Sequence, residues 1–249
     1  MKKIIVLLFY FVQFGFANEA AFKKANDLYK NENYQAAVQV FESISKSGFE
    51  AADLYFNIGN CYYKLGKTAP AIYNYEKALL LNPEDQAIKT NLTFAQKLAI
   101  DDIKIVPEVG FKNIIKKTTN LFHYDTWAWL SIGLAFFGLF TFLGYYFSGT
   151  VLLKRLFFSI FIVALLSVFV AVAAGFYNKK LDMTYNPAIV FATTTPLKAA
   201  PKNSSETVLT LHEGTKVVIL QELGNWNQVS LSDKTIAWIN KNDIKKIKD

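Results

Sequence analysis

Two long apolar runs without charged residues, at residues 127–147 and 156–177, dominate the hydropathy pattern of the chain. A helix needs about 20 apolar residues to cross the hydrocarbon core of a bilayer, so each run is long enough to span it once. The loop between them, residues 148–155, is too short for a folded domain. The pattern therefore predicts a transmembrane hairpin that places the preceding and following segments on the same side of a membrane.

The N-terminus predicts that this side lies outside the cytoplasm. Two lysines precede an apolar stretch that ends at Val12, and small residues follow at Gly15 and Ala17. This order is typical of a secretory signal peptide, here residues 1–17, and an uncleaved membrane anchor is the alternative. We therefore expect residues 18 onward to be exported, with both soluble parts on the outer side of the membrane and the loop at residues 148–155 in the cytoplasm.

An internal repeat precedes the hairpin. Residues 52–85 carry small side chains at Gly59 and Ala71, aromatic side chains at Tyr62 and Tyr75, and a proline near the end. This pattern resembles the tetratricopeptide repeat family. The resemblance implies a pair of antiparallel helices that cross closely where the small residues lie.

A weaker copy of the repeat covers residues 18–51. It lacks the glycine of the second copy, and Gly48 is expected to end its second helix with a positive φ angle. Residues 84–100 place apolar side chains along one helical face, which predicts the capping helix that a repeat stack requires. Together these segments predict an all-α tetratricopeptide repeat stack over residues 18–100.

The resemblance also implies a binding surface, because the first helices of such repeats bind extended peptides along their inner face. The matching positions are aromatic, amide or basic residues: Phe22, Asn26, Tyr29, Lys30, Phe56, Asn57, Asn60, Tyr63 and Lys64. They predict a groove that hydrogen-bonds the backbone of a peptide. The alternative is that they are ordinary consensus residues of the repeat. Cys61 lies beside the predicted helix crossing and is expected to be a packed core thiol.

Two connecting segments flank the hairpin. Residues 101–126 alternate apolar side chains with lysines in a helical pattern, which predicts an amphipathic juxtamembrane segment at the membrane interface. A loosely docked linker is the alternative for this segment. A second linker is expected at residues 178–187.

The last part of the chain, residues 188–249, has short alternating apolar runs between turn residues, which predicts a small all-β domain. Gly214, Trp226 and residues 237–239 resemble positions of bacterial SH3-type domains. That resemblance implies a small SH3-like barrel that binds extended peptides, including cell-wall peptides, with Trp226 as the expected contact. Trp238 is expected in the core, because its neighbours have the composition of a buried strand.

Composition argues against several classes of function. The formal net charge of +7 is spread over the signal peptide, the hairpin loop and the soluble segments, so no nucleic-acid partner is expected. The single cysteine and two histidines, His123 and His212, do not form the usual nucleophile–base or zinc patterns. We predict no metal, no cofactor and no enzymatic activity. The apolar runs contain no ionisable residue, which argues against transport.

The chain as a whole resembles the BatE family of the Bacteroides aerotolerance operon. It combines a signal peptide, two repeats, Asp-Thr-Trp at residues 125–127, a transmembrane hairpin and a terminal barrel in that order. The resemblance implies a bacterial inner-membrane protein with both soluble parts in the periplasm, which works with von Willebrand factor A-type membrane proteins in aerotolerance or envelope stress. We expect a non-enzymatic scaffold or adaptor that contacts membrane lipid and binds such protein partners. The alternative is an envelope sensor or anchor that binds cell-wall peptide through the barrel.

The predicted fold is therefore multidomain. It consists of an all-α tetratricopeptide repeat stack, a two-helix transmembrane hairpin and a small all-β SH3-like barrel.

Overall fold

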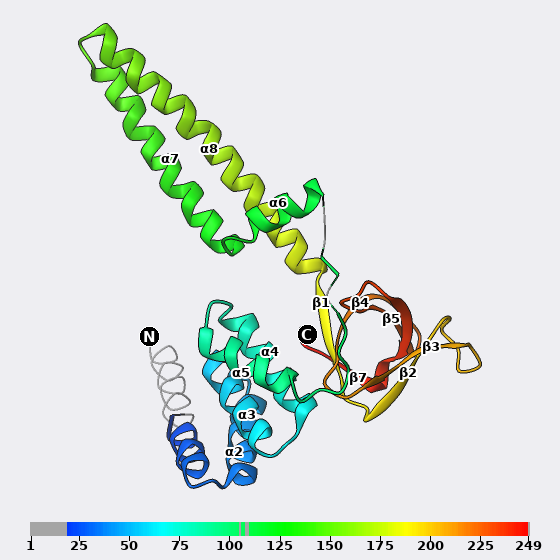
Figure 1. Cartoon of the computed structure of the whole chain (residues 1–249). Helices are drawn as coiled ribbons and strands as arrows, with labels where there is room; N and C mark the ends of the chain where they lie inside the picture. Colours follow the sequence, from blue (N-terminus) through cyan, green and yellow to red (C-terminus); the bar gives the residue numbers. More distant parts are fainter. Residues whose placement is uncertain (1–18, 105, 108–109, 249) are drawn as a thin grey trace, which may run out of the picture. The chain divides into compact units, whose positions relative to one another are not determined.

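Two units make up the fold (Figure 1), and one of them is discontinuous in sequence. The computed structural model describes residues 19–104, 106–107 and 110–248. The first unit combines the chain up to Val106 with the chain from Asn186 onward, and the second covers Pro107–Tyr185. The predicted signal peptide lies outside the described residues.

Consecutive helices form the N-terminal part of the first unit. They are residues 19–30, α2 (Tyr34–Lys46), α3 (Ala52–Lys64), α4 (Thr68–Leu81) and α5 (Gln86–Gln96). The side chain of Asn33 caps the start of α2 by accepting a hydrogen bond from the Ala36 N–H, and Asp85 caps α5 in the same way. Gly48 follows α2 with a φ angle of +86°, which confirms its predicted role. The predicted helical repeats are thereby confirmed, and α5 follows where a capping helix is expected.

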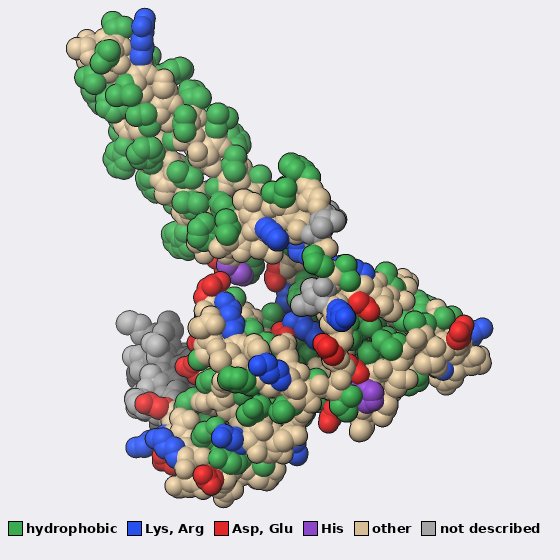
Figure 2. All heavy atoms as spheres, viewed as in Figure 1, with side chains coloured by type: hydrophobic (Ala, Val, Ile, Leu, Met, Phe, Trp, Pro, Cys, Tyr) green, Lys and Arg blue, Asp and Glu red, His purple; other side chains and the backbone are tan. Residues whose placement is uncertain are grey.

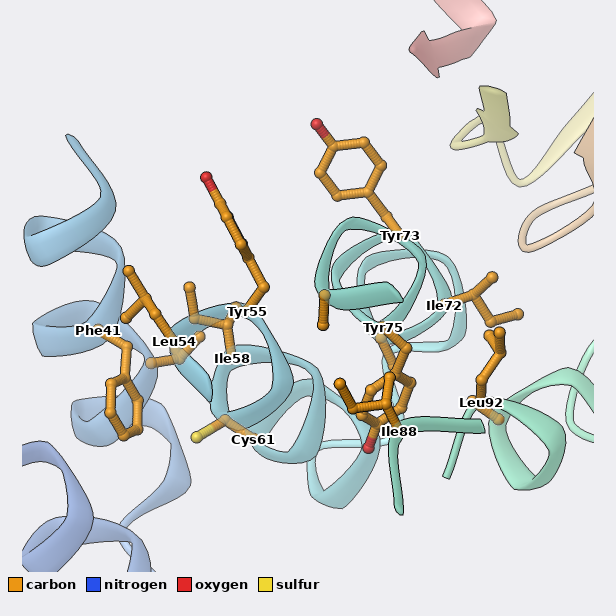
Figure 3. Packing of buried hydrophobic residues seen from close by; sticks show 14 of the residues in the cluster. Phe41, Leu54, Tyr55, Ile58, Cys61, Ile72, Tyr73, Tyr75, Ile88 and Leu92 are labelled. Atoms are coloured by element: carbon orange, nitrogen blue, oxygen red, sulfur yellow. The ribbon is translucent and has the colours of Figure 1, made fainter. Parts of the chain in front are cut away.

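The two helices of the second repeat cross at Gly59, as the sequence predicts. A Cβ atom at this position would lie 2.7 Å from both Cδ1 and Cε1 of Tyr75, so glycine permits the close approach of α3 and α4. Tyr75 is fully buried in a core cluster that also contains residues of α2 and α5, which Figure 3 shows from close by. Cys61 is buried in the same cluster, as expected.

A curled antiparallel sheet forms the rest of the first unit (Figure 1), and we call residues 186–248 the β-domain. Its strands are β1 (Asn186–Val190), β2 (Thr194–Lys198), β3 (Thr207–His212), β4 (Lys216–Leu223), β5 (Trp226–Ser230), β6 (Ile236–Asn240) and β7 (Ile244–Lys246). They are hydrogen-bonded in the order β3-β2-β6-β5-β4-β1-β7. The predicted C-terminal all-β part is confirmed. The structure also contains β2 and β7, which lie outside the apolar runs from which strands were predicted.

Strand β1 is buried from Pro187 to Val190, which explains why these residues are all apolar and do not alternate with polar ones. Ala188 and Val190 belong to the core of the β-domain. Ile189 instead joins the core cluster of the repeats, together with Ile247 from the end of the chain. The repeats and the β-domain therefore share apolar packing within one unit.

The core position predicted for Trp238 is wrong. In β6, Ala237 and Ile239 are buried in the core of the β-domain, whereas Trp238 is only half-buried. Side chains alternate between the two faces of a strand, so a residue between two core positions must point away from the core.

The second unit contains α6 (Phe111–Thr119) and the two apolar helices α7 (Tyr124–Phe147) and α8 (Val151–Thr184). The two apolar helices are long and apolar enough to cross a membrane, and Figure 2 shows hydrophobic side chains over their surface. They pack closely because the residues buried between them are small. These are Gly138, Thr141, Ala164, Ala171 and Ala174.

The ends of the hairpin differ from the prediction. Helix α8 begins at Val151, so only residues 148–150 are non-helical between the two long helices. It then continues to Thr184 through most of the linker expected at residues 178–187. The lysines after the apolar run end the segment that can lie in the hydrocarbon core of a membrane. The helix continues beyond them because lysine has a high helix propensity.

Helix α6 is amphipathic and is joined to both long helices at its C-terminal end. Phe111 and Ile114 are exposed along its apolar side. The carbonyl oxygen of Thr119 accepts hydrogen bonds from Trp127 Nε1 at 2.8 Å and from Asn178 Nδ2 at 3.1 Å. Hydrogen bonds from α7 and α8 thus fix the end of α6, which supports the amphipathic-segment interpretation over a loosely docked linker.

Candidate functional site

The residues predicted to line the repeat groove all lie on the first helices of the two repeats, and their best-defined feature is a repeated asparagine pair. Asn57 Nδ2 lies 3.5 Å from Asn26 Oδ1, and one repeat further on Asn91 Nδ2 lies 2.8 Å from Asn60 Oδ1. Both pairs join positions that are 31 residues apart. The same side-chain contact therefore links each first helix to the next one in the stack.

The asparagine pairs leave polar groups for a ligand. Among the described residues, Nδ2 of Asn26 and Oδ1 of Asn57 have no other hydrogen-bond partner, which leaves one donor and one acceptor for a peptide backbone. In the second pair, Asn60 Oδ1 also accepts a hydrogen bond from the Tyr75 hydroxyl at 2.8 Å. The sequence prediction did not include Asn91 in the groove. Its spacing of one repeat length from Asn57 is the signal that could have identified it.

The aromatic side chains of the groove are half-buried and held by ring contacts. Phe22 meets Phe41 edge to face with 5.4 Å between the ring centroids, and Tyr29 meets Tyr34 in the same way at 5.1 Å. Burial raises the pKa of Tyr29, so its hydroxyl is a neutral hydrogen-bonding group. The remaining groove residues are the partly buried Phe56 and Tyr63 and the exposed Lys30 and Lys64.

Cys61 lies on the same helix as the groove but does not contribute reactive chemistry. Its side chain is buried, and the loss of solvation raises the pKa of the thiol to about 12. A thiol of that pKa is almost entirely protonated at neutral pH, so it is a poor nucleophile and a poor metal ligand. Among the residues that the structure describes, no group of three or more His, Cys, Asp or Glu side chains could hold a metal ion.

Trp226, the contact predicted in the β-domain, shares one face of the sheet with Trp238. In the antiparallel pair β5–β6, Trp226 is opposite Asn240 and Gln228 is opposite Trp238, so the two tryptophans occupy diagonal positions. Both are half-buried, whereas Asn227 between Trp226 and Gln228 is buried on the other face. The structure therefore adds Trp238 to the surface that contains Trp226.

Polar contacts also fix the β-domain to the repeats. Lys216 Nζ lies 2.7 Å from both carboxylate oxygens of Glu76, a residue of α4 that is only 8% exposed. Asp101 accepts hydrogen bonds from the His212 backbone N–H at 2.7 Å and the Thr215 hydroxyl at 2.5 Å, and one of its oxygens lies 2.7 Å from His212 Nδ1. These contacts join residues more than a hundred positions apart, which periodicity cannot predict.

Hydrogen bonding dominates the electrostatics of Asp101. Burial alone would raise the pKa of its carboxyl group. The hydrogen bonds from His212 and Thr215 outweigh burial and hold the pKa of Asp101 below its ordinary value. The carboxylate is therefore charged across the neutral range, which keeps the junction between the repeats and the β-domain intact.

Comparison with known proteins supports the repeat assignment. The tetratricopeptide repeat family model matches residues 52–85, so this segment is a tetratricopeptide repeat. Tetratricopeptide repeat protein 16 from Homo sapiens and from Macaca fascicularis is 30% identical to this chain over 69 residues, which are 28% of this chain and 8% of each relative. Sperm-associated antigen 1 from Mus musculus is 32% identical over 79 residues, or 32% of this chain and 9% of the relative.

The chain thus spans less than a tenth of the length of these curated relatives. The similarity extends to segments of 69 and 79 residues, about two repeat lengths, and not to whole proteins. Tetratricopeptide repeats are protein-interaction modules, so the first unit contains a module of this kind. The second unit contains two helices that could cross a membrane.

Proposed function

We propose that the protein is a non-enzymatic scaffold, anchored in a bacterial inner membrane, whose repeat groove binds an extended segment of a partner protein in the periplasm. The single observation that carries this proposal is the repeated asparagine pair, Asn26–Asn57 and Asn60–Asn91. It fixes amide groups along successive first helices, and unpaired amide donors and acceptors can bind the backbone of an extended peptide regardless of its sequence.

The proposed partners are von Willebrand factor A-type membrane proteins, in a BatE-like role in aerotolerance or envelope stress. The order of the segments supports this choice, because repeats, hairpin and terminal β-domain occur as in that family. A hairpin anchor would tether the repeat groove to the membrane, which raises its effective concentration toward segments of neighbouring membrane proteins.

Photo-crosslinking in intact membranes tests the groove. A photoreactive amino acid in place of Tyr63 should crosslink to a von Willebrand factor A-type protein, whereas the same amino acid in place of Ser43, on the exposed side of α2, should not. Asn57→Ala combined with Tyr63→Ala should release that partner from detergent-solubilised complexes. The proposal fails if both positions crosslink to the same proteins, or if the double variant retains its partners.

The membrane orientation has a separate test. Lys64→Cys in α3 and Lys241→Cys after β6 should both react with a membrane-impermeant maleimide added to spheroplasts, and Gly149→Cys in the hairpin loop should react only after lysis. Reaction of Gly149→Cys before lysis would contradict a periplasmic location of the soluble parts.

The second candidate is an envelope sensor or anchor that binds cell-wall peptide through the β-domain. This candidate assumes that the β-domain is an SH3-like barrel. The shared face of Trp226 and Trp238 favours it, because paired aromatic side chains on a strand surface can pack against an extended peptide. Retention of the solubilised chain on purified wall material should decrease with Trp226→Ala and with Trp238→Ala. Retention that is equal for both variants and the unaltered chain would exclude this candidate.

A further inference from the structure

A hollow lies on the side of α3 and α4 that faces away from the asparagine pairs. Its volume is about 400 Å³, within the range of about 300–1,000 Å³ that is usual for ligand sites. We call it the tyrosine pocket, and its central lining residues are Tyr55, Tyr73, Asn74, Lys77, Phe191 and Lys245. Figure 3 shows Tyr55 and Tyr73 pointing to the same side of the helix pair, whereas Tyr75 points to the other.

Lysines hold their ammonium groups over the aromatic walls of this pocket. Lys77 Nζ, from α4, lies 5.1 Å from the ring centroid of Tyr55 and 5.8 Å from that of Tyr73. Lys245 Nζ, from the β-domain, lies 4.3 Å from the Tyr73 centroid and 5.7 Å from that of Phe191. Tyr73 and Phe191 also meet edge to face at 5.6 Å. Cations thus approach the same tyrosine ring from both the repeats and the β-domain.

Asn74 provides an independent sign of a ligand. It is 93% buried, and its Nδ2 donates a hydrogen bond to the carbonyl oxygen of Pro70 at 2.8 Å. Its Oδ1 has no hydrogen-bond partner among the described residues. Among those residues, every fully buried side-chain oxygen or nitrogen has a hydrogen-bond partner. Asn74 Oδ1 has none, so this atom is accessible, and it lies at the pocket that Asn74 lines. An amide oxygen that faces such a space can accept a hydrogen bond from a ligand.

The rim of the pocket combines more positive than negative charge. Its lining contains Lys46, Lys77 and Lys245 and one carboxylate, Glu42. The Glu42 carboxylate already accepts a hydrogen bond from the Tyr62 hydroxyl, whose pKa is raised by burial and by that carboxylate. An ammonium group carries three N–H donors, so a lysine can bind a further carboxylate and keep its contacts with the protein.

We propose that the tyrosine pocket binds a short acidic peptide segment. Carboxylates of the peptide bind Lys77 and Lys245, its apolar parts pack on Tyr55, Tyr73 and Phe191, and one backbone N–H donates to Asn74 Oδ1. The pocket offers charged donors, an aromatic wall and the accessible amide oxygen of Asn74, which together match a peptide better than a simple anion. This site is separate from the repeat groove and does not depend on the function proposed for it.

Calorimetric titration of the full-length chain in detergent micelles tests this site. The probe is acetyl-Glu-Ala-Glu-Leu-amide, and the control is acetyl-Gln-Ala-Gln-Leu-amide, which has the same shape without charge. We expect saturable binding of the acidic probe, at least tenfold weaker binding of the control, and about tenfold losses for Lys77→Gln and for Lys245→Gln. Lys77→Arg should retain binding, because it keeps the cation.

Control variants separate this site from the groove and from loss of folding. Lys64→Gln and the groove pair Asn57→Ala with Tyr63→Ala should bind the acidic probe normally. Labelling of the buried Cys61 thiol in each variant reports whether the repeats are folded. Absence of saturable binding, equal binding of the glutamine peptide, or equal binding of a hexathymidylate oligonucleotide would overturn the proposal. So would a loss of binding that follows the groove variants and not the lysine variants.

Discussion

The crossing of α3 and α4 at Gly59 leads to a quantitative prediction for Gly59→Ala. The added methyl carbon would lie 2.7 Å from two ring carbons of Tyr75 and 3.2 Å from a third, well inside normal contact. Overpacking of this kind costs about 1–3 kcal/mol, and the better helix propensity of alanine returns about 1 kcal/mol. Movement of the ring also weakens the hydrogen bond from Tyr75 to Asn60, worth about 1 kcal/mol. We expect the repeats to lose about 1–2 kcal/mol.

Cys61 provides the assay for this loss. It is the single cysteine of the chain, and its side chain is fully buried beside the crossing. A thiol reagent can react only when the repeats open, so the labelling rate of the solubilised full-length chain measures the open population. A loss of 1–2 kcal/mol should increase that rate about 5–30-fold.

A double-mutant cycle with Tyr75→Leu provides the control. With the aromatic ring absent, Gly59→Ala should no longer cause a clash, and its helix propensity should make labelling equally slow or slower. The packing explanation is refuted if Gly59→Ala leaves the labelling rate unchanged in the natural background. It is also refuted if the acceleration is the same with and without the ring.

Three further predictions concern the ends and junctions of the elements. Gly48→Ala should destabilise the repeats by about 1 kcal/mol in the same labelling assay, because the φ angle of +86° strains any residue with a Cβ atom. Glu76→Gln should cost about 1–2 kcal/mol in thermal unfolding, because it breaks a largely buried contact to Lys216, whereas Glu222→Gln in an exposed pair should cost less than about 0.5 kcal/mol. The pKa of Asp101 is lowered in the folded chain, so its contribution is complete above its ordinary value of about 4 and is lost as pH falls through the folded value. Acid titration of thermal stability should therefore show a loss below pH about 4 that Asp101→Asn largely removes.

The sequence predicted those parts of the fold that depend on residues close together in the chain. The close contact of Gly59 with Tyr75 follows from a small residue at a fixed place in a repeat. The helical hairpin follows from the length of two apolar runs. The sequence missed β2 because only one of its two buried positions, Leu197, is apolar, the other being Thr195, and because a proline between them argues against a strand.

Tertiary contacts account for most of what the sequence could not predict. The contact between Glu76 and Lys216 joins residues 140 positions apart, and the repeat pattern around Glu76 does not indicate a partner outside the repeats. Trp238 was misplaced because its apolar neighbours suggested a buried strand, while the alternation of β6 decides which face each side chain takes. The asparagine pairs were predicted in part. The repeat pattern identified Asn26, Asn57 and Asn60 as groove positions, but it did not show that asparagines of successive helices contact one another.

Helix α3 separates the two proposed sites by its own periodicity. Tyr55 and Tyr62 are two turns apart and face the tyrosine pocket, whereas Asn57 and Asn60 are rotated by roughly half a turn from them and face the groove. A shift of α3 relative to α4 is the direct route by which a ligand on one face could change affinity on the other. The close approach of Gly59 to Tyr75 favours a single position of α3 against α4. The two sites should therefore bind their ligands independently, so that the scaffold can hold two protein segments at once.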